Sequence, residues 1–250
     1  MQQYRPSGFS MLPLVVKNLL IINGIFFLAT MALESSLHID LVKYLGLHYP
    51  LSTDFGVWQL VSYMFMHGGF THILFNMFAL WMFGNTLENV WGPKRFLNYY
   101  LVTGIGAGVI QLLIAYLRIQ SIESGLHPEQ IAIVIQEGAD VLSRGMNYES
   151  IGMRELNLII NTPTVGASGA VFGILLAFGM MFPNSLIYVY FAIPVKAKYF
   201  VMIYGAIELY MGFANNPGDN VAHFAHLGGM IFGFLLIMYW KKKGTFSRPF

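Results

Sequence analysis

A serine between small residues stands at the head of a long apolar stretch, TPTVGASGAVFGILLAFG, which covers Thr162–Gly179. Two histidines, His223 and His226, open another apolar stretch, VAHFAHLGGMIFG. A serine oxygen within hydrogen-bond reach of an imidazole is the arrangement that a nucleophile and its general base require. Ser168 and His226 are therefore the candidate reactive pair, if the two stretches lie against each other.

A third apolar stretch carries His72 and Asn76, four residues apart in THILFNMF. Residues at i and i+4 share a helix face, so these side chains point the same way. Both can donate hydrogen bonds, as can the backbone N–H of Ser168 near a helix N-terminus. Such donors stabilise the oxyanion that forms when a serine attacks a carbonyl. Phe172, four residues after Ser168, is placed to pack on the His226 ring and fix its orientation.

Composition places these stretches in a membrane. The chain has 250 residues, of which 56% are hydrophobic and only 10% charged, whereas about a quarter of a soluble domain is charged. The apolar residues fall in blocks long enough to cross a bilayer, which takes about 20 helical residues. We predict an all-α bundle of six membrane-spanning helices: Leu14–Leu33, Thr71–Leu87, Phe96–Leu117, Thr164–Met181, Tyr199–Phe213 and Asn220–Trp240.

Lysines and arginines orient this bundle, because they are enriched in the cytoplasmic loops of membrane proteins. If the N-terminus is inside, the inner side holds ten of the 14: Arg5, Lys17, Lys94, Arg95, Lys196, Lys198, Lys241, Lys242, Lys243 and Arg248. We therefore expect both termini in the cytoplasm. In this topology His72, Asn76, Ser168 and His226 all lie within about 10 Å of the outer ends of their helices.

Small residues recur every fourth position beside both members of the candidate pair. Such stripes let helix backbones approach closely in lipid. Close contact between the two stripes would bring the Ser168 oxygen and the His226 imidazole together. The stripe after Ser168 consists of Gly169, Gly173 and Ala177, and the stripe around His226 consists of Ala225, Gly229 and Gly233.

Two connections between the predicted spans are long. Residues 34–69 form a first outer loop at the membrane edge, with a short helix predicted in VWQLVSYMFMHGG. Residues 118–163 form the only soluble-looking piece and carry six of the 12 acidic residues. An amphipathic helix is predicted from Pro128 to about Arg144, and a second short one over Glu149–Ile160. We expect a single membrane domain over residues 1–250, in which the 118–163 insertion is helical.

Blander interpretations of the same residues stay open. GASG in a membrane helix is often only a packing face, and HxxxN is often a hydrogen bond between helices. The HFAH spacing is half of a metal site that His67 or His72 could complete, as in a metal-binding or transport protein. Glu208 is expected to hydrogen-bond a neighbouring helix rather than to titrate in a mechanism. The absence of cysteine excludes thiolate chemistry, and the lysines at 241–243 fit a membrane anchor better than a nucleic-acid patch.

Three motifs, in this order, together resemble the rhomboid family of intramembrane serine proteases. They are HGGFTHILFNMFALWMFGNTLE (His67–Glu88), GASGAVFG (Gly166–Gly173) and AHFAHLGGMIFG (Ala222–Gly233). The resemblance implies that Ser168 is the nucleophile and His226 the general base of a dyad that needs no metal or cofactor. His72, Asn76 and the Ser168 N–H would form the oxyanion hole. The family has no third, acidic member, and the sequence offers no convincing one, since Asp219 lies at a loop edge.

The resemblance also implies partners and a location. The substrates would be single-span membrane proteins, cleaved near the outer face of the lipid bilayer, with no nucleic-acid partner. The alternative is a catalytically inactive, rhomboid-like binder of membrane proteins, against which the retention of Ser168 and His226 argues. We expect a multi-pass protein of a bacterial inner (plasma) membrane. The chain departs from the family pattern at Gln59, where an arginine often follows the tryptophan, and in its longer outer loop.

Overall fold

The computed structural model describes residues 10–189, 192–214 and 221–244, and these are predominantly helical. Four residues named above lie outside these ranges: Arg5, Asp219, Asn220 and Arg248. The elements are α1 (Leu14–Leu37), α2 (Leu41–Leu45), α3 (Gln59–Ser62), η1 (Tyr63–Phe65), α4 (Phe70–Ala79), η2 (Leu80–Gly84), α5 (Asn85–Trp91), α6 (Pro93–Glu123), α7 (Pro128–Ser143), α8 (Ile151–Asn161), α9 (Ser168–Met181), β1 (Leu186–Val189), β2 (Ile193–Lys196), α10 (Ala197–Ala214) and α11 (His223–Lys242).

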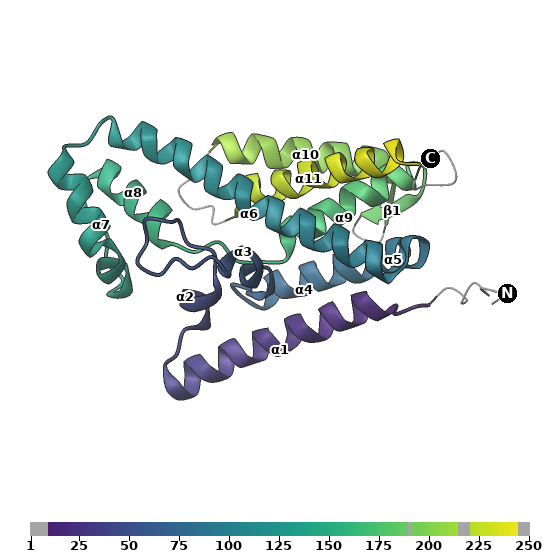
Figure 1. Ribbon diagram of the computed structural model, residues 1–250, viewed down its shortest axis with the longest axis horizontal. Coiled ribbons are helices and arrows are strands. Elements are labelled where there is room, and N and C mark those ends of the chain that lie inside the picture. The colour runs from purple at the N-terminus through teal and green to yellow at the C-terminus, as the bar shows by residue number, and fades with distance from the viewer. Residues whose placement is uncertain (1–9, 190–191, 215–220, 245–250) are drawn as a thin grey trace.

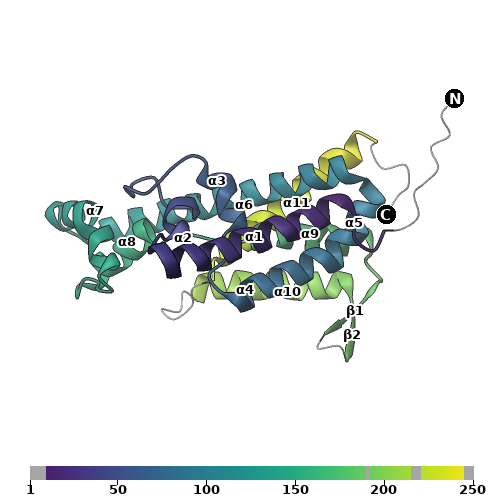
Figure 2. The ribbon, with the colours of Figure 1, turned by 90° about the horizontal axis from the view of Figure 1, so that it is seen from below.

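Helices α6, α9 and α11 pack against one another at the centre, with α10 against α9 and α11 (Figure 1). On the other side, α1 contacts α4, α5 and α6. The start of α1, the end of α11 and the β1–β2 hairpin lie at one end of the molecule, and α7 and α8 lie at the opposite end (Figures 1 and 2). Among the described residues, α1, α6 and α11 are long and apolar enough to cross a membrane, and α9 is a shorter apolar helix.

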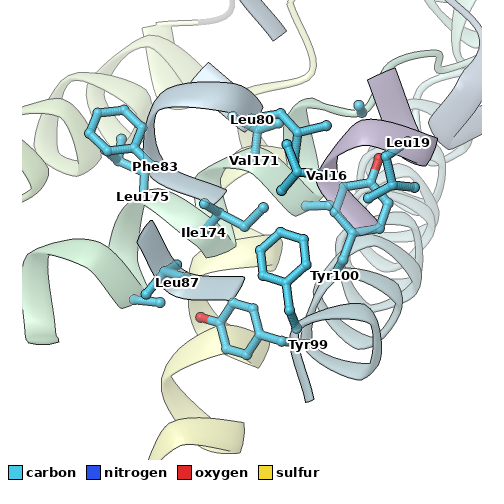
Figure 3. Close-up of a cluster of buried hydrophobic side chains, with 14 of the residues drawn as sticks. Val16, Leu19, Leu80, Phe83, Leu87, Tyr99, Tyr100, Val171, Ile174 and Leu175 are labelled. Atoms are coloured by element: carbon cyan, nitrogen blue, oxygen red, sulfur yellow. The ribbon is translucent and has the colours of Figure 1, made fainter. Parts of the chain in front are cut away.

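The main core lies where α1, the α4–α5 segment, α6 and α9 meet (Figure 3). Its labelled side chains are aliphatic and aromatic, and the tyrosines come from the long helix α6. Close packing of this kind drives helix association where lipid surrounds the helices. The cluster includes Val16, Leu19, Leu80, Phe83, Leu87, Tyr99, Tyr100, Val171, Ile174 and Leu175.

A buried carboxylate joins α5 to the start of α1. Glu88 accepts hydrogen bonds from the backbone N–H groups of Val15, at 2.9 Å, and Val16, at 2.8 Å. The first N–H groups of a helix have no partner within the helix, and the residue before α1, Pro13, offers no side-chain cap. Glu88 therefore satisfies donors that would otherwise be buried without a partner.

The predicted second span, Thr71–Leu87, differs from the observed helical segment. The helical path runs from Phe70 to Trp91 and is interrupted by η2, a turn of π-helix. Past Leu87, Glu88 contacts the start of α1 and Asn89 hydrogen-bonds Ser10, which precedes α1. The helical path ends at Gly92, which has a φ of 79° and is followed by Pro93 at the first turn of α6.

The all-α prediction needs one correction. Strands β1 and β2 form an antiparallel hairpin between α9 and α10, with Leu186 opposite Lys196 and Val189 opposite Ile193. The residues of these strands are mostly β-branched or aromatic, types that favour extended backbone over helix.

The 118–163 connection has its own small core. Helix α6 runs on to Glu123, and its end packs with α7 and α8 around a second cluster of buried apolar side chains. The insertion is thus attached to the extended end of α6. The buried members are Ile119, Val134, Met153, Leu156 and Ile160.

Candidate active site

Ser168 and His226 are in direct contact. The Oγ of Ser168 and the Nε2 of His226 lie 2.8 Å apart, a hydrogen-bond distance between a hydroxyl and an imidazole. Ser168 is the first residue of α9, and His226 lies in the first turn of α11. Because Ser168 begins its helix, its N–H has no carbonyl partner within the helix and remains a donor at the reactive oxygen.

Glycines let α9 and α11 approach closely enough for this contact. A Cβ on Gly229 would overlap the carbonyl oxygen of Gly169, so only a hydrogen fits between the two backbones. A Cβ on Gly233 would reach the hydroxyl of Tyr99, which donates to the carbonyl oxygen of Gly173 at 2.8 Å. The stripe on α9 also faces α6, because a Cβ on Gly169 would meet Ala107.

The His226 ring is held from one side by an aromatic neighbour. Phe172 stacks on it with a centroid distance of 4.1 Å and an interplanar angle of 6°. Phe172 in turn packs against Tyr204 of α10, at 4.9 Å between centroids. Since Phe172 follows Ser168 by one helical turn, one helix supplies both the hydroxyl and the surface that orients the imidazole.

The segment that precedes Ser168 is joined to the first outer loop. Leu47 and Thr164 exchange two backbone hydrogen bonds of 2.9 Å, in an antiparallel bridge. Two residues on, the N–H of Gly166 donates to the carbonyl oxygen of Tyr63 at 2.9 Å. Gly166 has a φ of 127°, which favours glycine. A Cβ there would lie 2.8 Å from the His72 ring and 3.4 Å from the Ser168 Oγ, so His72 and Ser168 flank this glycine.

His72 and Asn76 occupy one face of α4, as their spacing predicts. The Nδ1 of His72 accepts from the N–H of Gly68 at 3.4 Å, which leaves Nε2 to carry the proton of the neutral ring. The atoms of the ring nearest Gly166 are Cε1 and Nε2. Asn76 is buried one turn further on, and its amide donates to the carbonyl oxygen of His72 at 3.0 Å. The second N–H of the Asn76 amide is a further hydrogen-bond donor.

Sequence reasoning missed an acidic partner for His226. The Oε2 of Glu208, on α10, lies 2.8 Å from the Nδ1 of His226 and 2.6 Å from the Nδ1 of His223. The expectation that no acid faces this histidine was therefore wrong, although Glu208 does hydrogen-bond a neighbouring helix as predicted. The available signal was that an ionisable side chain within a membrane span is a functional candidate by default.

A family model described as Rhomboid domain matches residues 54–243. The chain belongs to the rhomboid family. This membership and the apolar helices make it an integral membrane protein.

Several curated rhomboid proteins are similar to this rhomboid. An uncharacterized mitochondrial rhomboid protein of Schizosaccharomyces pombe is 28% identical over 76% of this chain and 53% of its own length. The putative rhomboid protease YdcA of Bacillus subtilis is 28% identical over 72% of this chain and 65% of its own. The rhomboid protease AarA of Providencia stuartii is 27% identical over 75% and 57%. The chain thus spans about half the length of the curated relatives that it matches.

The histidines of this rhomboid do not assemble as the metal-site interpretation expects. His67 and His72 lie together, with ring centroids 5.1 Å apart, and neither belongs to the group of possible metal-binding side chains found among the described residues. The donor atoms of Glu208, His223 and His226 instead lie within 4.8 Å of one another. Two imidazoles and a carboxylate suit zinc or a similar divalent ion, yet the oxygen–nitrogen distances of 2.6 and 2.8 Å are those of direct hydrogen bonds.

Proposed function

We propose that this rhomboid is an intramembrane serine endopeptidase that cleaves single-span membrane proteins near the outer face of the bilayer. The observation that carries the proposal is the 2.8 Å contact between the Ser168 Oγ and the His226 Nε2, made between the starts of two helices. The names of relatives such as AarA, a rhomboid protease, agree with it.

The chemistry follows from the positions of these groups. The Oγ of Ser168 attacks the scissile carbonyl carbon while its proton passes to the Nε2 of His226. The negative charge that forms on the carbonyl oxygen is stabilised by the Ser168 N–H, His72 and Asn76. The C–N bond then breaks as His226 returns the proton to the leaving amine. Water, deprotonated by His226, hydrolyses the resulting ester and restores the Ser168 hydroxyl.

The topology that we propose has six spans: α1, the α4–α5 segment, α6, α9, α10 and α11. With both termini cytoplasmic, α7, α8 and the starts of α9 and α11 belong to the outer side, where water can reach Ser168. The whole of residues 1–250 then forms one domain, with 34–69 and 118–163 as outer loops. Relatives occur in bacteria and in mitochondria, and we assign this chain to a bacterial plasma membrane.

Labelling with a serine-directed phosphonate probe tests the proposal, together with cleavage of a single-span substrate in liposomes. Wild type should label and cleave, whereas Ser168→Ala and His226→Ala should do neither. Ser143→Ala, which alters an exposed serine on α7, is the matched control and should behave as wild type. Equal labelling of all four proteins would contradict the proposal. A wild type that binds the substrate without cleaving it would favour the inactive binder.

A further inference from the structure

A carboxylate lies on the far side of the His226 ring from Ser168. The Nε2 of His226 faces the serine at 2.8 Å, and its Nδ1 faces the Oε2 of Glu208 at 2.8 Å. Three helices, α9, α11 and α10, each contribute one of the three residues. Resting on the proposed function, we propose that Glu208 is a positioning residue of the reaction, which holds His226 in the orientation and tautomer that the serine needs.

The tautomer follows from the donor inventory. An ionised carboxylate can only accept hydrogen bonds, so each imidazole nitrogen beside the Oε2 of Glu208 must carry a hydrogen. In the neutral ring of His226 the proton is then on Nδ1 and the lone pair on Nε2. That lone pair is the acceptor which the Ser168 hydroxyl requires. Without Glu208, the two tautomers of His226 compete, and the one with a hydrogen on Nε2 cannot take the serine proton.

Both Glu208 and His226 are buried, so an ionised Glu208 depends on hydrogen bonds from protein groups. Glu208 is 4% exposed and His226 is 8% exposed, and Glu208 lies in an apolar helix. A buried charge is costly unless hydrogen-bonded, and two N–H donors on one oxygen supply that compensation. When the serine proton reaches Nε2, the new imidazolium has its counter-charge already in contact.

His223 also holds the carboxylate of Glu208 in place. It precedes His226 by three residues on α11, which places both rings on the same helix face, with centroids 6.3 Å apart. Its Nδ1 lies 2.6 Å from the same oxygen that faces His226. The groups around the imidazole of His226 are thus His223 from its own helix, Ser168 and Phe172 from α9, and Glu208 from α10. His72 lies across Gly166 from Ser168.

The chain offers a matched control for the loss of this charge. Glu88 is another buried carboxylate, 3% exposed, that accepts two hydrogen bonds, but both donors are backbone N–H groups of α1. Glu88→Gln and Glu208→Gln therefore remove the same charge from two buried sites. Only the second site touches His226. Any effect that Glu208→Gln has beyond Glu88→Gln belongs to its contact with the histidines.

The experiment measures kcat and KM for a single-span substrate in liposomes, per folded molecule, for wild type, Glu208→Gln, Glu208→Asp and Glu88→Gln. We expect Glu208→Gln to lower kcat on the order of 10²-fold with little change in KM, because general base catalysis contributes 10²–10⁴-fold. Glu208→Asp keeps the charge and should recover part of the loss. Glu88→Gln should keep the kcat of wild type.

Two further measurements are made on the wild-type protein itself. Ring ¹⁵N chemical shifts of His226 in the wild-type protein, assigned by comparison with His226→Ala, should report a hydrogen on Nδ1. EDTA treatment should leave kcat unchanged.

Three results would overturn the proposal while leaving the protease intact: a Glu208→Gln enzyme within threefold of wild type, a wild-type His226 with its hydrogen on Nε2, or loss of activity on EDTA treatment with recovery on adding zinc. The last would make Glu208, His223 and His226 a metal site. Failure of the proposed function looks different, since wild type itself would then neither cleave nor label.

Discussion

Glu88 and Glu208 are both buried carboxylates, but they stand at opposite ends of the helix bundle and have different partners. Glu88 accepts from two backbone N–H groups at the start of α1, which lies at the same end of the molecule as the end of α11 (Figure 1). Glu208 faces two imidazoles at the start of α11. Backbone amides do not titrate, so the two donors to Glu88 keep their hydrogens throughout a reaction. Imidazoles gain and lose protons, so the environment of Glu208 changes during a reaction.

The difference shows how one residue type serves two purposes in a membrane protein. At the start of α1, Glu88 completes the hydrogen bonding of a helix start, and its contribution is to stability. At the start of α11, Glu208 is buried to nearly the same extent and contacts the imidazole that hydrogen-bonds Ser168. Burial alone does not separate the two cases. The two carboxylates are distinguished by the chemistry of their hydrogen-bond partners, and variants in the two regions test this contrast.

The largest effect is expected from Asn76→Ala, which alters the outer region without touching either glutamate. Removing one oxyanion donor from a serine protease costs on the order of 10²–10³-fold in kcat. The thermal midpoint should change little, because the lost bond from the Asn76 amide goes to the carbonyl of its own helix. Initial rates of cleavage and a thermal melt check both points. An unfolded variant would assign Asn76 to structure instead.

Gly229→Ala should come next, because it changes the distance between the helices that carry the reactive pair. The added Cβ would overlap the backbone of Gly169, which cannot rotate away as a side chain can. A misplacement of about 1 Å costs on the order of 10²-fold in rate. The matched control is Gly24→Ala on α1, where nothing lies within 4 Å of the new atom. Equal activity of the two variants would show that helix contact at Gly229 does not set the site.

Glu88→Gln should affect stability rather than catalysis. The charge-assisted bonds to Val15 and Val16 weaken, and we expect a loss of about 1–2 kcal/mol in the free energy of unfolding. Unfolding in mixed micelles of increasing SDS fraction measures it. A fall in kcat per folded molecule would contradict the contrast with Glu208, because it would show that Glu88 also influences catalysis.

The smallest effect is expected from Phe172→Leu. It removes the ring that stacks on His226 but leaves an apolar side chain of similar reach. Aromatic pairs contribute about 0.5–1.5 kcal/mol beyond their buried area, which corresponds to a loss in kcat of up to about tenfold. Phe172→Tyr keeps the ring and should stay near wild type. A Leu variant as active as wild type would leave Glu208 as the main group that orients the imidazole.

The parts of this site that are spaced along one helix could be predicted from the sequence. The pairs His72 with Asn76 and Ser168 with Phe172 follow from helical periodicity, and the glycine stripes indicated that α9 and α11 touch. The partner of Glu208 could not be predicted in this way. It depends on the rotation of α10 about its axis and on its shift along α11, which are settled by packing between helices and not by periodicity within one.

Other parts of the fold differ from the prediction because local contacts and backbone preferences outweigh the length and hydropathy of a segment. The π turn at Leu80–Gly84 leaves no mark in an apolar sequence, and the end of α5 depends on a contact between Glu88 and a distant helix. The β1–β2 hairpin is carried by four-residue strands, too short for period-two alternation to be recognised.

The antiparallel bridge between Leu47 and Thr164 fixes the segment that leads to Ser168. Ser168 follows Thr164 by four residues, and Gly166 between them is bonded to Tyr63 of the same outer loop. The position of the Ser168 hydroxyl is thus set relative to residues 47–63, much as the register of a strand is set by its neighbour in a sheet. Inserting a single residue between Leu47 and the start of α3 would move one anchor relative to the other, and we expect it to shift Ser168 although the sequences of α9 and α11 are unchanged.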